Sequence, residues 1–203
     1  MTSYLIIILM GYLMGSSSMS FYVSKLKKIE IRDKGSKNLG ASNTMMVLGW
    51  KYGVLVGLHD IGKSVLAVVL AKHFFPTLEL AGFIAGVASV LGHIYPFYLK
   101  FKGGKGFASY FGMTLALNWK LALVIGILVV LVTLITDYIV VGTTLTITAV
   151  PIFYGIITKG FLIPLILLIG TIVIIYKHRM NYVRIYNGTE IGLRSANRGE
   201  HRA

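Results

Sequence analysis

The sequence predicts an all-α polytopic membrane protein with about seven transmembrane helices. Apolar residues make up 56% of its 203 residues and charged residues only 13%, whereas soluble domains are about 45–50% apolar and about 25% charged. Long apolar runs recur from one end of the chain to the other, which is typical of repeated membrane crossings. The absence of cysteine excludes disulfides and thiolate metal sites.

Six apolar stretches approach the roughly 20 residues that a helix needs to cross a bilayer. They cover residues 3–23, 53–72, 80–98, 119–136, 141–158 and 161–177. A shorter stretch, 106–118, is interpreted as a tilted or half-buried helix and gives the seventh. The first stretch lacks a basic start, so it is interpreted as a retained anchor and not as a signal peptide. We expect a single membrane domain over residues 1–192 and a polar, mobile tail over residues 193–203.

Basic residues predict the orientation in the membrane. If the N-terminus lies outside and seven helices cross, sixteen of the 20 Lys and Arg residues fall on the cytoplasmic side, three fall outside and Lys63 falls within a span. This asymmetry follows the positive-inside rule and puts the C-terminus in the cytoplasm. The net charge of +13 is then directed at anionic lipid heads or anionic substrates. No basic stripe interleaved with aromatic residues indicates nucleic acid as a partner.

The stretch GLHDIGKS, residues 57–64, matches the phosphate-loop pattern GxxxxGK[ST] at every constrained position. A phosphate loop joins a strand to a helix, but apolar helical sequence flanks this stretch on both sides, so a nucleotide-binding site is rejected. Asp60 and Lys63 then lie near mid-membrane on one helix face. Two interpretations stay open: a structural ion pair that joins helices, or a cation that lines an anion site.

Two polar segments on the expected cytoplasmic side have compositions that suit phosphate. Residues 32–45 offer Ser36, Asn38 and Asn43 among small residues that permit close backbone approach. Residues 92–109 contain His93 and the run KGGKG, in which glycines expose backbone N–H groups and lysines supply charge. Taken alone, residues 32–45 are more simply interpreted as a flexible loop, and KGGKG alone is a modest indication of phosphate.

A third polar segment, residues 176–190, follows the last apolar stretch and contains His178, Arg179 and Asn181 within one helical turn. Taken alone, it also suits a basic belt that holds anionic lipid. Three such segments on one membrane face indicate an interfacial site for a phosphorylated, lipid-linked substrate. No group of residues indicates a metal site.

In this order and spacing, GSKNLGASN, GHIYPFYLKFKGGKGFAS and HRMNYVRIYNGTE resemble the acyl-phosphate-dependent glycerol-3-phosphate acyltransferases of bacteria, the PlsY family. The family patterns read approximately GSGNxGATNxxR, GHxxPxFxxFKGGKGxAT and HRxNxxRxxxGxE. The resemblance extends from residue 15 to Glu190, and DIGKS is similar to the family's Asp-x-x-Lys-Gly segment. It implies a small multi-pass bundle in the bacterial inner membrane, with an active site that faces the cytoplasm.

The resemblance also implies an activity. The family transfers a fatty acyl group from acyl phosphate to the 1-hydroxyl of glycerol 3-phosphate, the first step of phospholipid synthesis, and releases lysophosphatidate and phosphate. No cofactor is expected. The expected partners are the two substrates, membrane lipid and an enzyme that produces acyl phosphate, and the protein is expected to be a monomer.

Roles for individual residues follow from the matching positions. His178, Asn181 and Ser36 are expected to be catalytic, and Asp60 and Glu190 to be structural. The expected substrate-binding residues are Asn38, Asn43, Lys63, His93, Lys102, Gly103, Gly104, Lys105 and Gly106.

Several positions depart from the family patterns. Lys37 and Ser64 stand where the family has Gly, Met46 stands where the first motif ends in Arg, and Val140 lacks an expected hydroxyl. Losing the Arg removes charge-assisted hydrogen bonds of about 1.5–3 kcal/mol each, and a lysine is a point charge that does not reproduce the fork of an arginine.

Two alternatives therefore stay open. One is a divergent paralogue with another acyl acceptor. The other is a non-catalytic membrane protein that binds or transports phospholipid or phosphate. Transport is disfavoured because the polar segments gather on one face and do not meet at mid-membrane between broken helices.

Overall fold

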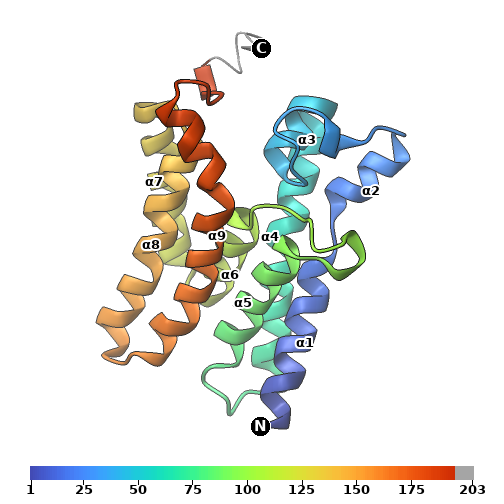
Figure 1. Cartoon of the computed structure of the whole chain (residues 1–203). Coiled ribbons are helices and arrows are strands. Elements are labelled where there is room, and N and C mark those ends of the chain that lie inside the picture. Colours follow the sequence, from blue (N-terminus) through green and yellow to red (C-terminus); the bar gives the residue numbers. More distant parts are fainter. Residues whose placement is uncertain (195–203) are drawn as a thin grey trace. The chain divides into compact units, whose positions relative to one another are not determined.

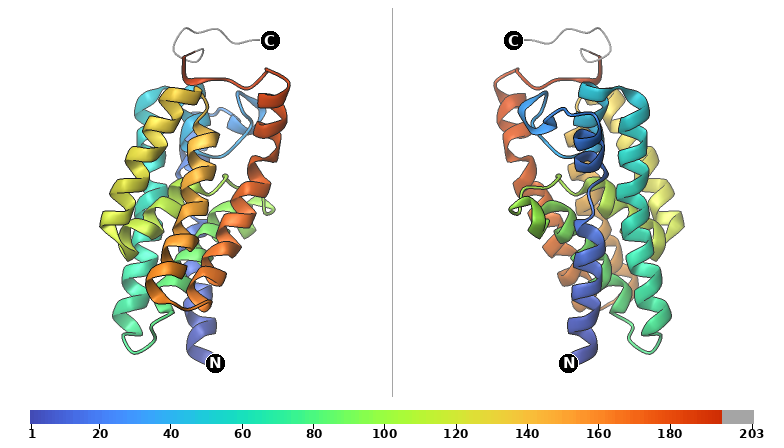
Figure 2. Two further views of the ribbon diagram at one scale, coloured as in Figure 1. Left: turned by 90° about the vertical axis from the view of Figure 1, so that its left-hand side faces the viewer. Right: turned by 90° about the vertical axis from the view of Figure 1, so that its right-hand side faces the viewer.

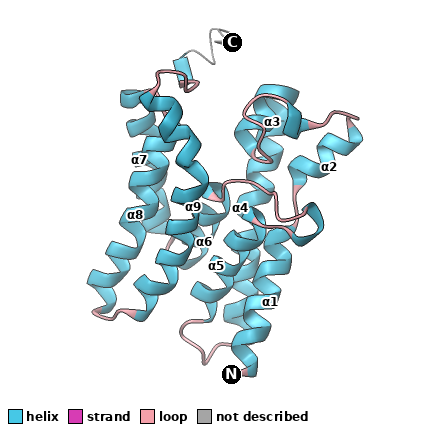
Figure 3. Cartoon of the chain, in the orientation of Figure 1, coloured by secondary structure: helices cyan, strands magenta, loops and turns pink. Residues whose placement is uncertain are grey.

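The computed structural model describes residues 1–194, which form helices joined by loops (Figure 3). No strand occurs among these residues. The chain divides into two units, residues 1–117 and residues 118–203, and each has its own set of packed helices. The expected single domain over residues 1–192 stays a prediction. Residues 195–203 of the predicted mobile tail lie outside the described part.

Six α-helices build the first unit (Figure 1). They are α1 (Thr2–Ser16), α2 (Met19–Leu26), α3 (Ala41–Leu48), α4 (Trp50–Phe74), α5 (Ala81–Ile94) and α6 (Phe107–Leu117), with the 3-10 turns η1 (Ile31–Asp33) and η2 (Phe97–Leu99). Helix α5 packs against α1, α4 and α6, and α4 also contacts α3 and α6. Figure 2 shows the N-terminus at one end of this unit and α2 and α3 at the other.

Small residues let α1 and α5 approach closely. A Cβ atom added to Gly15 would lie 2.0 Å from the carbonyl oxygen of Ser89, and one added to Gly92 would lie 2.2 Å from the carbonyl oxygen of Tyr12. Membrane helices associate through such small-residue interfaces, because lipid provides no hydrophobic force that drives helices together. The close contact fixes α5, which carries His93, relative to α1.

Six segments of the described chain are long and apolar enough to cross a membrane. They are Thr2–Leu26, Trp50–Phe74, Ala81–Leu99, Trp119–Thr136, Ile139–Thr158 and Leu162–Tyr186. They agree with the six long stretches predicted from the sequence. The seventh stretch forms α6, whose 11 residues span about 16 Å, or about half of a bilayer's apolar core. The all-helical membrane fold is thus confirmed, whereas seven crossings and the outside N-terminus stay predictions.

The first span is not one continuous helix. Ser17 and Ser18, between α1 and α2, have ψ angles of 132° and 100°, far from helical values. The carbonyl of Ser17 accepts a hydrogen bond from Lys63, and the carbonyl of Ser16 accepts one from Tyr98. These long-range donors satisfy carbonyl groups that a broken membrane helix leaves without helical partners.

Residues 57–64 lie inside α4. Their backbone N–H groups belong to a continuous helix, so the match to a phosphate loop is accidental, as predicted.

Three helices build the described part of the second unit: α7 (Trp119–Thr136), α8 (Ile139–Thr158) and α9 (Leu162–Tyr186). Helix α8 packs against both α7 and α9, and Thr171 of α9 donates a 3.0 Å hydrogen bond to the carbonyl of Ile147. Apolar side chains on α7 are exposed, as expected of a helix that faces lipid; they include Leu123, Val124, Ile127, Val130, Leu131 and Leu134.

The chain after α9 returns to the turn between α7 and α8. The backbone N–H of Leu193 donates to the carbonyl of Asp137 at 2.9 Å, and that of Arg194 donates to the Asp137 carboxylate at 2.8 Å. The first two residues of the predicted tail are therefore held by the second unit.

Candidate active site

Asn43 organises the first polar segment. Its amide nitrogen donates to the carbonyls of Ile31 and Asn38, both at 3.0 Å, and its amide oxygen accepts from the backbone N–H of Ser36 at 2.7 Å. The side chain is only 1% exposed. Asn43 therefore folds the segment around itself. Direct contact between Asn43 and substrate stays a prediction.

Around Asn43, the segment presents Ser36 and Asn38 half-buried and Lys37 exposed. Lys37 has a φ of +56°, in the left-handed region. Side chains with a Cβ are disfavoured there, which gives a physical reason for the glycine of the family pattern. Lys37 thus supplies a cation to this segment in a strained backbone conformation.

The arginine within this segment does not replace the one missing at Met46. Arg32 donates to the Glu30 carboxylate at 2.9 Å, and this hydrogen bond lowers the pKa of Glu30 below its ordinary value. Arg32 is therefore paired with its own neighbour. Met46 lies half-buried on α3.

The glycine loop, residues 102–106, folds back on the end of α5. The N–H of Gly103 donates to the carbonyl of Ile94 at 3.0 Å, and the N–H of Gly104 donates to that of His93 at 3.1 Å. These bonds satisfy carbonyls at the helix terminus. Lys102 is exposed and Lys105 is half-buried, so the loop carries its two cations on a backbone anchored to α5.

The first two polar segments meet at Gly104. A Cβ atom added to Gly104 would lie 2.0 Å from Nε2 of His93 and 2.7 Å from the carbonyl oxygen of Leu39. Leu39 also packs in a buried cluster with Ile31 and Leu99, which joins the same two segments. The structure therefore brings residues 32–45 and 92–109 together within the first unit, and glycine is required at the point of contact.

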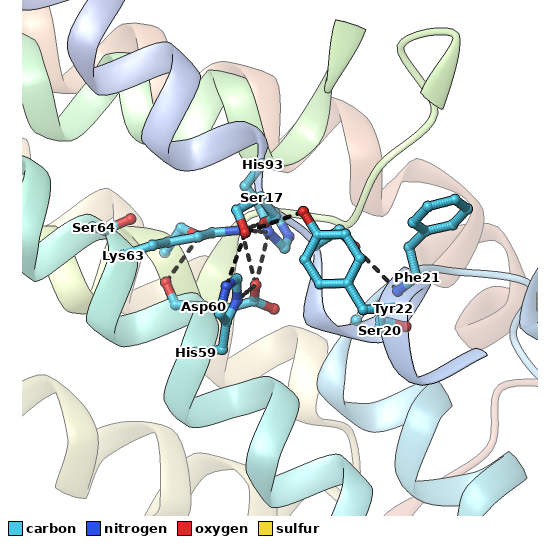
Figure 4. A network of polar contacts seen from close by, with 12 residues as sticks. Ser17, Ser20, Phe21, Tyr22, His59, Asp60, Lys63, Ser64 and His93 are labelled. Atoms are coloured by element: carbon cyan, nitrogen blue, oxygen red, sulfur yellow. Dashed lines mark hydrogen bonds and ion pairs between the residues drawn. The ribbon is translucent and has the colours of Figure 1, made fainter. Parts of the chain in front are cut away.

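Asp60, Lys63 and His93 form a buried polar cluster (Figure 4). Lys63 Nζ lies 2.9 Å from Asp60 Oδ1, 2.9 Å from His93 Nδ1 and 2.6 Å from the carbonyl oxygen of Ser17. An ammonium group has three donors, and these three atoms surround it; Nδ1 of His93 also lies 3.3 Å from Asp60 Oδ1. The contacts favour a structural ion pair that joins α1, α4 and α5 over a cation that lines an anion site.

His59 extends this cluster on the other side of Asp60. Its Nε2 lies 3.0 Å from Ser17 Oγ, and its Nδ1 lies 3.5 Å from Asp60 Oδ1. Tyr22 lies 3.4 Å from Ser17 Oγ and 3.4 Å from the hydroxyl of Tyr98. The sequence analysis did not identify these residues: Ser17, His59, Tyr22 and Tyr98. The available indication was the run of three serines at residues 16–18, inside an apolar span, which includes Ser17.

In the second unit, His178 and Asn181 are both buried on α9. Nδ1 of His178 lies 2.9 Å from the carbonyl oxygen of Ile174. A carbonyl only accepts, so Nδ1 carries the proton and the lone pair of a neutral ring is on Nε2. This tautomer suits a hydrogen-bond acceptor or a base.

Glu190 binds two neighbours on the last turns of α9. Its carboxylate accepts from Asn181 Nδ2 at 2.5 Å and from Arg184 Nε at 2.5 Å. The segment after α9 thereby fixes the amide of Asn181. This arrangement supports the structural role expected for Glu190.

The departure at Val140 concerns a buried position on α8. The nearby hydroxyl of Thr144 donates to the carbonyl of Val140 at 2.8 Å and lies 2.5 Å from the hydroxyl of Tyr182. Thr144 therefore joins α8 to α9.

Comparison with known proteins supplies the family. The sequence model of the family described as glycerol-3-phosphate acyltransferase matches residues 5–188. The chain belongs to this family. The glycerol-3-phosphate acyltransferase 1 of Oceanobacillus iheyensis is 41% identical, over 95% of this chain and 96% of that protein. The glycerol-3-phosphate acyltransferase of Shouchella clausii is 38% identical, over 90% of this chain and 92% of that protein.

The fold is also similar to solved members of the glycerol-3-phosphate acyltransferase family. The crystal structure of PlsY, an integral membrane glycerol 3-phosphate acyltransferase, in its glycerol 3-phosphate form has a TM-score of 0.87 and 31% identity, over 96% of this chain and 98% of that one. The lysophosphatidic acid form has a TM-score of 0.83. The family predicted from the three polar segments is therefore confirmed, as is an integral membrane enzyme of the acyltransferase class.

Proposed function

We propose that this protein transfers a fatty acyl group from acyl phosphate to the 1-hydroxyl of glycerol 3-phosphate. The observation that carries the proposal is the family match over residues 5–188. Acylation of glycerol 3-phosphate in phospholipid synthesis follows from membership of the family. The choice of acyl phosphate as donor rests on the similarity of the three polar segments to the PlsY patterns and on the PlsY structures that share the fold.

The reaction needs no covalent enzyme intermediate, because acyl phosphate is already an activated anhydride. The 1-hydroxyl oxygen forms a bond to the acyl carbon, the bond between that carbon and the phosphate oxygen breaks, and phosphate leaves with the electron pair. The hydroxyl proton passes to a phosphate oxygen of the substrates or to His178. The protein's task is to hold two anions close together, and proximity supplies much of such a rate gain.

The first unit supplies the proposed binding groups for glycerol 3-phosphate. Lys102 and Lys105 offer charge on a loop that the N–H groups of Gly103 and Gly104 anchor to α5, and Gly106 takes a φ of +100° that favours glycine. Asn38 offers an amide from the adjoining segment, and Ser36 of the same segment offers a hydroxyl as a proposed catalytic group. Lys63, Asn43 and His93 remain members of this proposed set. Their polar contacts within the protein favour support of the binding groups over direct contact with the ligand.

The second unit supplies two of the three proposed catalytic groups, His178 and Asn181. His178 presents an acceptor nitrogen, and Asn181 presents an amide fixed by Glu190. We assign His178 to positioning and hydrogen bonding of the attacking hydroxyl, with the substrate phosphate as the principal base. Stabilisation of the developing oxyanion by preorganised donors is usually the largest contribution to such catalysis.

The cellular setting is also proposed in part. The chain is a multi-pass protein of a bacterial membrane, since its relatives are bacterial and its fold is that of an integral membrane enzyme. We propose the inner membrane with the site on the cytoplasmic face, a monomer, and an acyl-phosphate-producing enzyme as partner. The excess of Lys and Arg in the expected cytoplasmic segments supports this orientation.

A second candidate, a divergent paralogue that uses another acyl acceptor, is favoured by one observation. Met46 removes an arginine from a segment expected to bind phosphate, and the strained Lys37 does not reproduce its fork. The assay below separates the candidates by the product that forms.

The test uses purified protein in detergent or lipidic phase with palmitoyl phosphate and glycerol 3-phosphate. Release of phosphate and formation of lysophosphatidate are followed together, with palmitoyl-CoA as an alternative donor and Lys105→Ala as a binding-site variant. We expect equal amounts of both products from palmitoyl phosphate, none from palmitoyl-CoA, and a large loss in the variant. Phosphate release without lysophosphatidate would favour the paralogue, and product from palmitoyl-CoA alone would overturn the proposed donor.

A further inference from the structure

The mid-membrane charges of α4 belong to a cluster that the proposed reaction does not use directly. The side chains of Lys63 and Asp60 are 5% and 3% exposed, and they lie 2.9 Å apart. Buried charges are costly unless each is paired and fully hydrogen-bonded. Here Lys63 has a second partner on α5 and a third at the break between α1 and α2. The cluster is therefore a polar network that joins three helices and not an isolated ion pair.

The network reaches the glycine loop through His93. Nδ1 of His93 lies 2.9 Å from Lys63 Nζ and 3.3 Å from Asp60 Oδ1, so one side of the ring contacts both charges of the pair. Nε2 faces Gly104, where a Cβ atom would lie 2.0 Å away. The carbonyl of His93 accepts the N–H of Gly104, and that of Ile94 accepts the N–H of Gly103. His93 thus contacts the glycine loop with both its ring and its backbone carbonyl.

The network also reaches the start of the same loop from α1. Lys63 binds the carbonyl of Ser17, and Tyr98 of η2 binds the carbonyl of Ser16 at 3.0 Å. The break in the first span is therefore tied at adjacent residues to the mid-membrane cluster and to the chain that leads into residues 102–106. Displacement of Lys63 affects both supports of the loop.

We propose that Asp60, Lys63 and His93 are positioning residues that hold the glycine loop in the geometry that binds the phosphate of glycerol 3-phosphate. The inference rests on the proposed function of that loop. It resolves the open choice for Lys63: the ammonium acts on the substrate through His93 and Ser17, without contact. It also gives a reason for retaining a buried charge pair at this depth of the membrane.

Ser64 provides a matched control on the same helix. Its hydroxyl is fully buried and lies 2.8 Å from Ser89 Oγ of α5. Ser64→Ala therefore removes a buried polar contact between α4 and α5 one residue away from Lys63, and that contact does not involve the loop. A general loosening of α4 against α5 would affect both variants alike.

The test compares Ser64→Ala with Asp60→Asn combined with Lys63→Met, which removes both charges and leaves neither one buried alone. Hydrogen exchange at the amides of Gly103 and Gly104 is measured without substrates, and KM for each substrate and kcat are measured with them. In the double variant we expect exchange to rise about tenfold or more and KM for glycerol 3-phosphate to rise about tenfold, with KM for acyl phosphate within about twofold. Ser64→Ala is expected to match the wild-type protein.

Two results would overturn the inference. One is a folded double variant whose loop exchange and KM for glycerol 3-phosphate equal those of the wild type. The other is a double variant in which KM for both substrates changes alike, with the same change in Ser64→Ala. If the double variant does not fold, His93→Gln, which leaves Asp60 and Lys63 paired, is measured in the same way and decides by the same criteria.

Failure of the proposed function is distinguishable. It would appear as a wild-type protein that forms no lysophosphatidate, and loop exchange alone would then decide the role of the network: faster exchange in the double variant upholds the positioning role, and unchanged exchange overturns it.

Discussion

The two units of the chain fix their polar groups in different ways. In residues 1–117 the groups expected to bind substrate lie on loops, and buried side chains from several helices hold those loops; Asn43 and His93 each contact the backbone of residues distant in sequence. In residues 118–194 the groups expected to act in the reaction lie on one helix. His178 is bonded to its own helix, and Asn181 is bonded to the segment directly after it.

The difference reflects the two proposed tasks, binding of an anion by a loop and reaction by groups on a helix. The glycine loop has no regular structure of its own and uses the N–H groups of Gly103 and Gly104 in hydrogen bonds to α5, so its geometry comes from surrounding contacts. His178 and Asn181 are three residues apart on α9, and helix geometry alone puts them on one face. Changes in the first unit should therefore act at a distance through its contacts, whereas changes in the second should act locally.

The largest effect is expected for Gly104→Ala. The added methyl group would meet His93 Nε2 at 2.0 Å and the carbonyl of Leu39 at 2.7 Å, and neither neighbour is the free end of a flexible chain. We expect KM for glycerol 3-phosphate to rise about 10²-fold, since small misplacements of a binding group have effects of this order. Gly62→Ala is the control, because a Cβ atom there meets nothing within 4 Å. Equal behaviour of the two variants in steady-state kinetics would contradict the packing at Gly104.

An intermediate effect is expected for Glu190→Gln in the second unit. The carboxylate accepts hydrogen bonds from both Asn181 and Arg184. In glutamine an NH₂ group replaces one of the two oxygens, so two donors would face each other at one of these contacts. We expect the free energy of unfolding to fall by about 1–3 kcal/mol. The fall should lie at the lower end of this range because the side chain of Arg184 is 35% exposed. We also expect a lower kcat. Thermal unfolding in detergent measures the first and initial rates the second. Glu30→Gln, at an exposed pair within its own segment, should leave both unchanged.

The smallest effect is expected for Lys37→Gly. Glycine relieves a φ of +56° and should raise stability by about 1 kcal/mol. Lys28 has a φ of +55°, so Lys28→Gly is a conformational control outside the first motif. A similar gain in thermal unfolding temperature for both would assign the effect to backbone strain.

Adding Met46→Arg to Lys37→Gly sharpens the comparison between the units. The pair restores the family pattern, and we expect kcat/KM for glycerol 3-phosphate to rise, by about tenfold for one charge-assisted contact. Met45→Arg adds the same charge to the neighbouring exposed position of α3 and should give no gain. No gain from Met46→Arg either would favour the paralogue with another acceptor.

The helices could be predicted from the sequence because each depends on a local apolar run. The lengths of the apolar runs alone identified the six long spans and the short α6. The break at Ser17 and Ser18 could not be predicted in this way, because it depends on Lys63 and Tyr98, which are distant in sequence. Long-range donors, and not the serines alone, make the interruption stable in a membrane.

The candidate site shows the same division. The three polar segments were recognisable from composition and spacing, and the pairing of Asp60 with Lys63 followed from their helical spacing. The third partner of Lys63 and the packing of His93 against Gly104 depend on how α1, α4 and α5 cross. Nor could the role of Asn43 be derived from a motif, since its three bonds go to backbone groups of a folded loop.

The most direct test of this account is the separation of binding from reaction between the two units. KM and kcat are measured for Lys105→Ala and His178→Ala under the same conditions, with both substrates varied. This separation predicts that Lys105→Ala raises KM for glycerol 3-phosphate about tenfold or more and that His178→Ala, which removes one hydrogen bond, lowers kcat about 10- to 10²-fold with little change in either KM. Unchanged turnover in His178→Ala, or the same change of KM and kcat in both variants, would contradict it.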